Sequence, residues 1–219
     1  MVPLSFAGHC FHLLCSGALW WPAQRTLLVA DLHFEKASHF AARGWMLPPF
    51  DSIATLRRLA ADAQAMEAAA IIALGDSFHD PAGPGRLPPA ARSLLAALAA
   101  AHPVTWITGN HDPALPAGLG ASMAGLQLDG LRLCHAPDPG DPAPQVAGHF
   151  HPKLLVETRG RRISRRCFVR GPARLLLPAY GALAGGLDAR DPAIRAAVGW
   201  PATAHVPLSQ GALSVALAA

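Results

Sequence analysis

The sequence lacks the features that mark membrane-spanning and secreted proteins. Among its 219 residues no apolar run reaches the roughly 18 residues needed to cross a bilayer, because Pro, Arg or His interrupts each candidate. The first sixteen residues contain no basic segment, and His9 and His12 interrupt their apolar part, which argues against a signal peptide. We therefore expect a cytoplasmic protein with no membrane partner.

Cysteine and lysine are both scarce. The four cysteines have neither Cys-x-x-Cys spacing nor the density of a disulfide framework, so we expect buried free thiols and no redox chemistry. There are 2 lysines against 16 arginines, a bias that a GC-rich genome also produces. Internal repeats and a low-complexity tail are missing as well. The cysteines are Cys10, Cys15, Cys134 and Cys167.

Apolar residues, in contrast, are abundant. With 52% hydrophobic and 15% charged residues the chain can bury a sizeable core, and its length fits one domain over residues 1–219. In the first half, short apolar runs alternate with helical patterns, which is typical of a parallel sheet covered by helices. We expect strands at 9–14, 18–21, 26–30, 69–74 and 104–108, helices at 34–43, 53–67 and 90–101, and a loop at 77–89.

The second half of the chain has a mostly β pattern. A hairpin is expected over 122–134 with its turn at Asp129-Gly130. Residues 179–202 are weakly patterned, with at most a short helix after Pro192. Further strands are expected near 153–158, 161–170, 173–178 and 212–217.

Four apolar strands end in residues that can bind a metal ion. Such side chains converge when the strands are parallel, and buried polar groups are costly unless they are paired or metal-bound. A fifth segment, Gly148 to His151, adds two imidazoles. The candidate ligands are Asp31, His33, Asp76, Asn110, His135, His149 and His151.

These donor types indicate phosphoester chemistry. Carboxylate, imidazole and amide donors suit Mn²⁺, Fe²⁺ or Zn²⁺ better than a structural cysteine-based zinc site does. Seven donors exceed what one ion needs once water and substrate also bind, so we expect two ions. If Asp76 bridges them, ions about 4 Å apart can hold a hydroxide and clamp a phosphoryl group for in-line attack.

Two residues next to Asn110 are candidate catalytic residues. His111 is expected to point toward substrate, where it could stabilise the transition state or protonate the leaving oxygen. Asp112 would then orient the imidazole of His111. Together the ligands and His111 predict hydrolysis of a phosphoester.

Positive charge is concentrated in one segment. The net charge is +4, and seven arginines fall within residues 159–174. This segment is a candidate phosphate-binding face, and the alternative is a solvated edge hairpin in which arginine blocks aggregation. The residues expected to contact substrate are Arg161, Arg162, Arg165 and Arg166.

Some other side chains have two interpretations each. Lys36 would neutralise a phosphate oxygen or lie on a helix surface, and His79 would face the ligands and substrate or be an ordinary loop histidine. His39 and His102 are treated as ordinary histidines. The exposed pair Trp20-Trp21 would form a partner or dimer surface, or pack under a neighbouring loop.

The motifs, in this order, resemble the full set of calcineurin-like metallophosphoesterases. The resemblance implies an α/β fold, a four-layer αββα sandwich of two mixed β-sheets flanked by helices. It also implies two divalent ions, with Mn²⁺ favoured and Fe or Zn as alternatives. One ion would be held by Asp31, His33, Asp76 and His151, and the other by Asp76, Asn110, His135 and His149.

Finer details are similar to one bacterial subfamily. The runs Asp31 to Lys36 and Gly75 to Asp80, together with the compact size, resemble the endonucleases associated with a DNA ligase and a helicase in the DNA-damage response. This implies a phosphodiesterase that cleaves DNA, with ligase, helicase or exonuclease partners. The alternatives are a phosphoesterase acting on a nucleotide or cyclic nucleotide, and a non-enzymatic protein-binding scaffold; a homodimer is left open.

Overall fold

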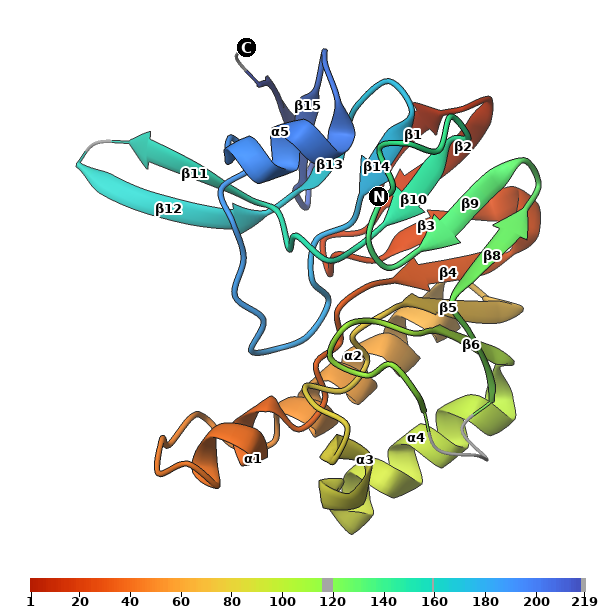
Figure 1. Cartoon of the computed structure of the whole chain (residues 1–219), viewed down its shortest axis with the longest axis vertical. Coiled ribbons are helices and arrows are strands. Elements are labelled where there is room, and N and C mark those ends of the chain that lie inside the picture. The colour runs from red at the N-terminus through yellow and green to blue at the C-terminus, as the bar shows by residue number, and fades with distance from the viewer. Residues whose placement is uncertain (116–119, 159, 218–219) are drawn as a thin grey trace.

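The computed structural model describes residues 1–115, 120–158 and 160–217, and two seven-stranded sheets form its centre (Figure 1). In the first sheet the strands follow chain order. The first four strands form an antiparallel meander, and the later strands pair in parallel. The strands are β1 (Val2–Phe6), β2 (His9–Leu13), β3 (Leu19–Trp21), β4 (Thr26–Val29), β5 (Ala70–Leu74), β6 (Val104–Ile107) and β7 (Ala121–Met123).

The second sheet has the order β16-β15-β13-β14-β10-β9-β8. Strand β10 pairs in parallel with β9 and β14, and the other pairs are antiparallel. The strands are β8 (Gly125–Leu128), β9 (Leu131–Cys134), β10 (Gln145–Ala147), β13 (Phe168–Arg170), β14 (Arg174–Leu176), β15 (Thr203–Pro207) and β16 (Ala212–Ala216). A separate hairpin of β11 (Lys153–Thr158) and β12 (Arg161–Arg166) projects from the sandwich (Figure 1).

Helices cover the outer faces of the two sheets. Helices α2 (Asp51–Ala65) and α4 (Pro89–Ala101) pack on the first sheet, and α5 (Pro192–Val198) packs on the second. Successive side chains of a strand point to opposite faces of the sheet. Leu27 therefore belongs to the hydrophobic cluster under the helices, and Leu28 belongs to the cluster between the two sheets. The resulting four layers confirm the αββα sandwich expected from the sequence.

Several expected elements differ from the observed ones. The sequence predicted no strand at β1, β10 or β15, and the expected loop at 77–89 contains α3 (Gly83–Arg86). A three-residue strand such as β10 is too short to show alternation. The expected strand 161–170 is divided at Cys167, whose amide donates to the carbonyl of Pro152, so that β12 and β13 lie in different sheets.

One of the two interpretations of Trp20-Trp21, and the expected burial of two of the cysteines, were wrong. Trp20 and Trp21 are 8% and 0% exposed, because β3 lies between β2 and β4 and not at an edge, so the pair is no partner surface. Cys10 and Cys15 are exposed, whereas the other two thiols are buried, and all four are free. Cys10 alternates with the buried Phe11 along β2 and therefore points to solvent.

No helix in the described part of the chain is long and apolar enough to cross a membrane.

Candidate metal centre

The ligand-bearing loops meet where the strands of the two sheets end. Strands β4, β5 and β6 are parallel, so their carboxyl ends share one edge, as do those of β9 and β10. Pairing continues past the strands, because the amides of Asp31 and His33 donate to the carbonyls of Gly75 and Asp76 at 3.1 and 2.9 Å. The loops are therefore held in register as they enter the site.

Five of the predicted ligands have left-handed backbone conformations. Their φ angles are 54° for Asp31, 45° for His33, 49° for Asp76, 75° for His149 and 49° for His151. Each such conformation costs a non-glycine residue on the order of 1–3 kcal/mol. Strain of this kind clusters at functional sites, where the surrounding structure enforces it.

Both carboxylates are buried and fixed by backbone amides. Asp31 and Asp76 are 0% and 2% exposed. The amide of His149 donates to Asp31 Oδ2 at 3.0 Å, and the amide of His111 donates to Asp76 Oδ1 at 2.9 Å. The second oxygen of each carboxylate faces the imidazole rings, at 3.3 Å from His151 Nε2 for Asp31 Oδ1.

Two glycines provide the space for these carboxylates. A Cβ atom on Gly109 would lie 2.1 Å from Asp76 Oδ1, and one on Gly148 would lie 2.6 Å from Asp31 Oδ2. Both distances are far below van der Waals contact. The glycines that precede Asn110 and His149 in the motifs are thus required by the approach of the neighbouring loop.

One group of donors consists of Asp31, His33 and His151. The Nε2 atoms of His33 and His151 are 3.2 Å apart, and the ligand atoms of the three residues all lie within 4.8 Å of one another. A carboxylate oxygen and two imidazole nitrogens at this spacing suit a divalent ion of the first transition series.

A second group surrounds the ring of His135. Its Nδ1 donates to the carbonyl of Leu74 at 3.1 Å, which leaves Nε2 with a free lone pair. That lone pair faces Asn110 Oδ1 at 2.9 Å and Asp76 Oδ2 at 3.4 Å, both of which are acceptors, and His149 Nδ1 lies at 3.1 Å. Converging acceptors repel unless a cation lies between them, so the donor set fits a metal ion.

The structure thus brings all seven predicted ligands to one place. Asp31 belongs to both a group with His33 and His151 and a group with Asp76 and His135. The ligand roles, and the bridging role of Asp76, stay predictions.

Burial keeps two of these histidines neutral. Desolvation, reinforced by the neighbouring histidines, lowers the pKa of His33 to about 2, and desolvation lowers the pKa of His149. A neutral imidazole is the form that binds a metal, so protonation does not compete with the ion at neutral pH.

The metal-free protein is expected to lose stability below about pH 6.5. In that range the unfolded chain binds a proton at His33 and the folded chain does not, so the free energy of unfolding falls by up to about 1.4 kcal/mol per pH unit. Urea unfolding in EDTA across a pH series measures this slope. A His33→Ala variant provides the control, because its slope should be smaller, and equal slopes for the two proteins would refute the assignment.

His111 is oriented differently from the expected arrangement. Its Nδ1 donates to the carbonyl of His79 at 2.7 Å, whereas the carboxylate of Asp112 accepts from the amides of Phe78 and Gly109 at 3.0 Å each. Asp112 therefore ties two loops together, and the role expected for it, orienting the imidazole, is filled by a backbone carbonyl. His111 Nε2 lies 3.9 Å from Asp76 Oδ2.

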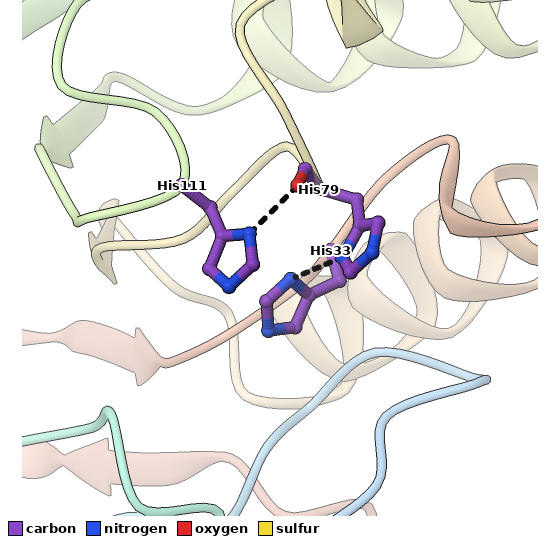
Figure 2. A group of neighbouring side chains, drawn as sticks. All are labelled: His33, His79 and His111. Carbon is purple, nitrogen blue, oxygen red and sulfur yellow. Dashed lines mark hydrogen bonds between the residues drawn. The ribbon is translucent and has the colours of Figure 1, made fainter. Parts of the chain in front are cut away.

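His79 completes a group of three histidines (Figure 2). The Nδ1 atoms of His79 and His33 are 3.2 Å apart, and the ring centroids of His79 and His111 are 5.0 Å apart. Burial, with the positive charge of Lys36, lowers the pKa of His79 to about 4. His39 packs edge-on against His79 at 4.6 Å, so it lies in this group's surroundings and is not an ordinary surface histidine.

An ion pair supports this side of the site. Asp80 accepts from Arg86 at 2.5 Å and lies 2.6 Å from His39 Nδ1. The hydrogen bonds from the Arg86 guanidinium hold the pKa of Asp80 well below its usual range. Sequence reasoning missed both roles, because nothing in the sequence indicates that Arg86 folds back onto Asp80.

Both lysines of the chain lie close in sequence to predicted ligands. Lys36 begins α1 (Lys36–Ala41), and its charge acts on His33 and His79. Burial and the positive charge of Lys153 lower the pKa of Lys36, and Lys153 Nζ donates to the carbonyl of Ala184 at 3.4 Å. Sequence reasoning missed Lys153, although its rarity and its position two residues after His151 were available signals.

The four predicted substrate-binding arginines divide between the two faces of β12. Arg161 and Arg165 alternate with Arg162 and Arg166, so only two can share a face. Arg166 is partly buried and donates to the carbonyl of Gly181 at 2.5 Å, and burial lowers its pKa to about 10. The other three are exposed. Arg159, which belongs to the same basic segment, lies outside the described residues.

The chain is similar to known proteins. The nuclease MPE of Pseudomonas putida is 30% identical, with a TM-score of 0.73 over 93% of this chain and 94% of that chain. A predicted phosphoesterase of Streptococcus pneumoniae is 12% identical, with a TM-score of 0.35 over 87% of this chain and 96% of that chain, a likeness too slight to inform the site. A search of curated protein sequences finds no significant match.

The family model for calcineurin-like phosphoesterases matches residues 24–159, which include every predicted ligand and His111. This match and the likeness to a nuclease confirm the resemblance inferred from the motifs. The two donor groups consist of residues that could hold metal ions. The chain belongs to the calcineurin-like phosphoesterase family and is a metal-dependent phosphoester hydrolase.

Proposed function

We propose that the chain is a dinuclear-metal-dependent phosphodiesterase that cleaves nucleic acid. Its proposed substrate is DNA, which it would cleave as an endonuclease. The observation that carries the proposal is that two donor groups share Asp31 and that the second of them contains Asp76. The relative at 30% identity is described as a nuclease, which supports a polymeric substrate. The proposed ions are Mn²⁺, with Fe or Zn as alternatives.

The chain's own residues prepare the site for a phosphodiester. When bound, two divalent ions would supply Lewis acidity and a nucleophile at neutral pH. The backbone amides that bind Asp31 and Asp76 hold each carboxylate in one orientation, so little rearrangement is needed when a substrate arrives.

His111 is placed to handle a proton. Because its Nδ1 donates to the carbonyl of His79, the neutral ring carries its hydrogen on that nitrogen and presents an unprotonated Nε2 toward Asp76. Once protonated, Nε2 can donate to an oxygen of the phosphoryl group or to the leaving oxygen. This keeps both roles expected for His111 open.

Lys36 and Lys153 are proposed to receive phosphate. The positive charge of Lys153 acts on Lys36, and an anion bound near both would relieve the repulsion between them. The exposed arginines of β12 would extend this positive surface along a polymer backbone. A role in DNA-damage response, with ligase, helicase or exonuclease partners, follows from the subfamily resemblance and stays a prediction.

The proposal is tested by the turnover of two substrates with Mn²⁺, namely bis(p-nitrophenyl) phosphate and circular single-stranded DNA. Cleavage of both is expected, and DNA binding should weaken steeply with salt because phosphate contacts release counterions. Turnover of the small diester alone would replace the proposal with a small-molecule phosphoesterase. No turnover with any divalent metal would favour the scaffold alternative.

A further inference from the structure

Three large apolar side chains are exposed in the segment between α1 and α2. Trp45, Met46 and Phe50 are 70%, 84% and 69% exposed. Among the described residues they form the densest group of exposed large hydrophobic side chains, since the others are dispersed along the chain. Burying such side chains is favourable, so a cluster of them on the surface indicates a binding site. We call Trp45, Met46 and Phe50 the apolar surface.

An apolar pocket adjoins this surface. It has a volume of about 490 Å³ and is lined by the end of α1, the connecting segment and the start of α2. The apolar residues that line it include Ala37, Ala41, Met46, Leu47, Phe50 and Ile53.

The backbone beside the exposed aromatic side chains has a defined conformation. Phe50 has a φ angle of 69°, a left-handed conformation that is unfavourable for a bulky residue. The amide of Trp45 donates to the carbonyl of Phe40 at 3.0 Å, which fixes the turn that follows α1. Strained backbone of this kind clusters at functional sites.

Helix α1 connects the apolar surface to the metal centre. At its start the charge of Lys36 acts on His33 and His79, and the ring of Phe40 stacks on His79 at 5.6 Å. The six residues of α1 advance about 9 Å along the helix axis. In Figure 1, α1 and the hairpin β11–β12 project toward the same side of the molecule.

A positively charged side chain lies near each end of α1. Lys36 lies at one end of α1, and Arg43, which is exposed, follows its other end. We consider a ligand whose phosphodiester lies at the metal centre and which also contacts these cations and the exposed aromatic rings. Such a ligand must combine an anionic backbone with flat apolar groups. A nucleic-acid strand has both, provided that its bases are not paired and can splay away from one another.

We propose that Trp45 and Phe50 stack unpaired bases of a nucleic-acid strand whose phosphodiester lies at the metal centre. The inference rests on the proposed function and adds to it a second contact region. This region would contact the flat faces of the bases and not the phosphates. A protein partner or a second copy of the chain would gain nothing from the link to the metal centre.

The test compares two fluorescein-labelled strands by anisotropy with Ca²⁺ in place of Mn²⁺, so that the metal centre is filled, and gel electrophoresis checks that the strands stay intact. One strand is oligo(dT), and the other is an abasic strand of equal length that keeps the phosphates and lacks the bases. The wild type should bind oligo(dT) more tightly, and Trp45→Ala and Phe50→Ala should each weaken that binding roughly 5- to 150-fold while affecting the abasic strand little. Binding of oligo(dT) should also quench the Trp45 fluorescence.

Trp200→Ala is the matched control. Trp200 is 47% exposed and shares a pocket with the cation Arg195, but it follows α5 on the far side of the second sheet. Its substitution should leave the affinity for both strands unchanged, and circular dichroism checks that each variant is folded.

The outcomes separate this inference from the proposed function. Equal affinity of the wild type for the two strands, or unchanged oligo(dT) affinity in both aromatic variants, overturns the stacking role even if DNA is cleaved. Self-association that is lost in Phe50→Ala, with DNA binding intact, would also overturn it in favour of a dimer surface. Failure to cleave DNA, in contrast, overturns the proposed function and leaves the binding result to decide the inference.

Discussion

Replacing Asp76 by Asn is expected to lower kcat/KM for bis(p-nitrophenyl) phosphate by roughly 10³-fold or more, since a metal ion supplies several kcal/mol of transition-state stabilisation. The substitution keeps the size of the side chain but removes its negative charge. Asp76 Oδ2 is 3.4 Å from His135 Nε2, so the change reaches the second donor group directly. The amide of His111 can still donate to an oxygen at this position.

Metal-dependent stabilisation separates the loss of an ion from the loss of chemistry. For the wild type, Mn²⁺ at about 100 times its dissociation constant should add about 2.7 kcal/mol to the free energy of unfolding. That corresponds to a rise in Tm of about 5–11 °C for a chain of this size. Asp76→Asn should show a much smaller rise.

Asp129→Asn is the control for this prediction. Asp129 lies in the turn between β8 and β9, whereas His135 follows the far end of β9. The side chain of Asp129 is 52% exposed. The variant should keep both turnover and the metal-induced rise in Tm. Wild-type turnover in Asp76→Asn would show that this carboxylate has no part in metal binding or catalysis.

The layered fold and the grouping of the ligands were predictable because both depend on local patterns. Buried strands such as β5 show as short apolar runs, and a residue at the carboxyl end of one parallel strand must lie near those at the ends of its neighbours. Asp31 and Asp76 follow two such strands, so their proximity required no knowledge of distant contacts.

Other features depend on contacts that the sequence does not display. The carboxylate of Asp112 accepts from Phe78, 34 residues away, and Arg86 reaches Ser38, 48 residues away. The exposure of Trp45 follows from the direction in which the chain leaves α1, which no hydrophobic pattern records. The arginines of β12 were visible in the sequence, but their division between two faces required knowing that residues 161–166 form a strand.

His111→Ala is expected to reduce kcat about 10²- to 10⁴-fold while leaving the Mn²⁺-induced rise in Tm near the wild-type value. His111 belongs to neither of the donor groups that contain Asp31, so removing its imidazole leaves those donors in place. His102→Ala is a closely matched control, because His102 Nδ1 also donates to a backbone carbonyl, that of Ala68 at 2.9 Å, next to the end of α4. This variant should keep full turnover.

The leaving group decides between the two roles of His111. p-Nitrophenolate leaves without protonation, whereas the alkoxide released from DNA requires a proton. If Nε2 protonates the leaving oxygen, His111→Ala should slow DNA cleavage much more than cleavage of bis(p-nitrophenyl) phosphate. If Nε2 stabilises charge on the phosphoryl oxygens, the two substrates should lose rate to a similar extent. Unchanged rates for both would exclude His111 from the chemistry and leave Asp76 and the other ligands to act without a proton donor.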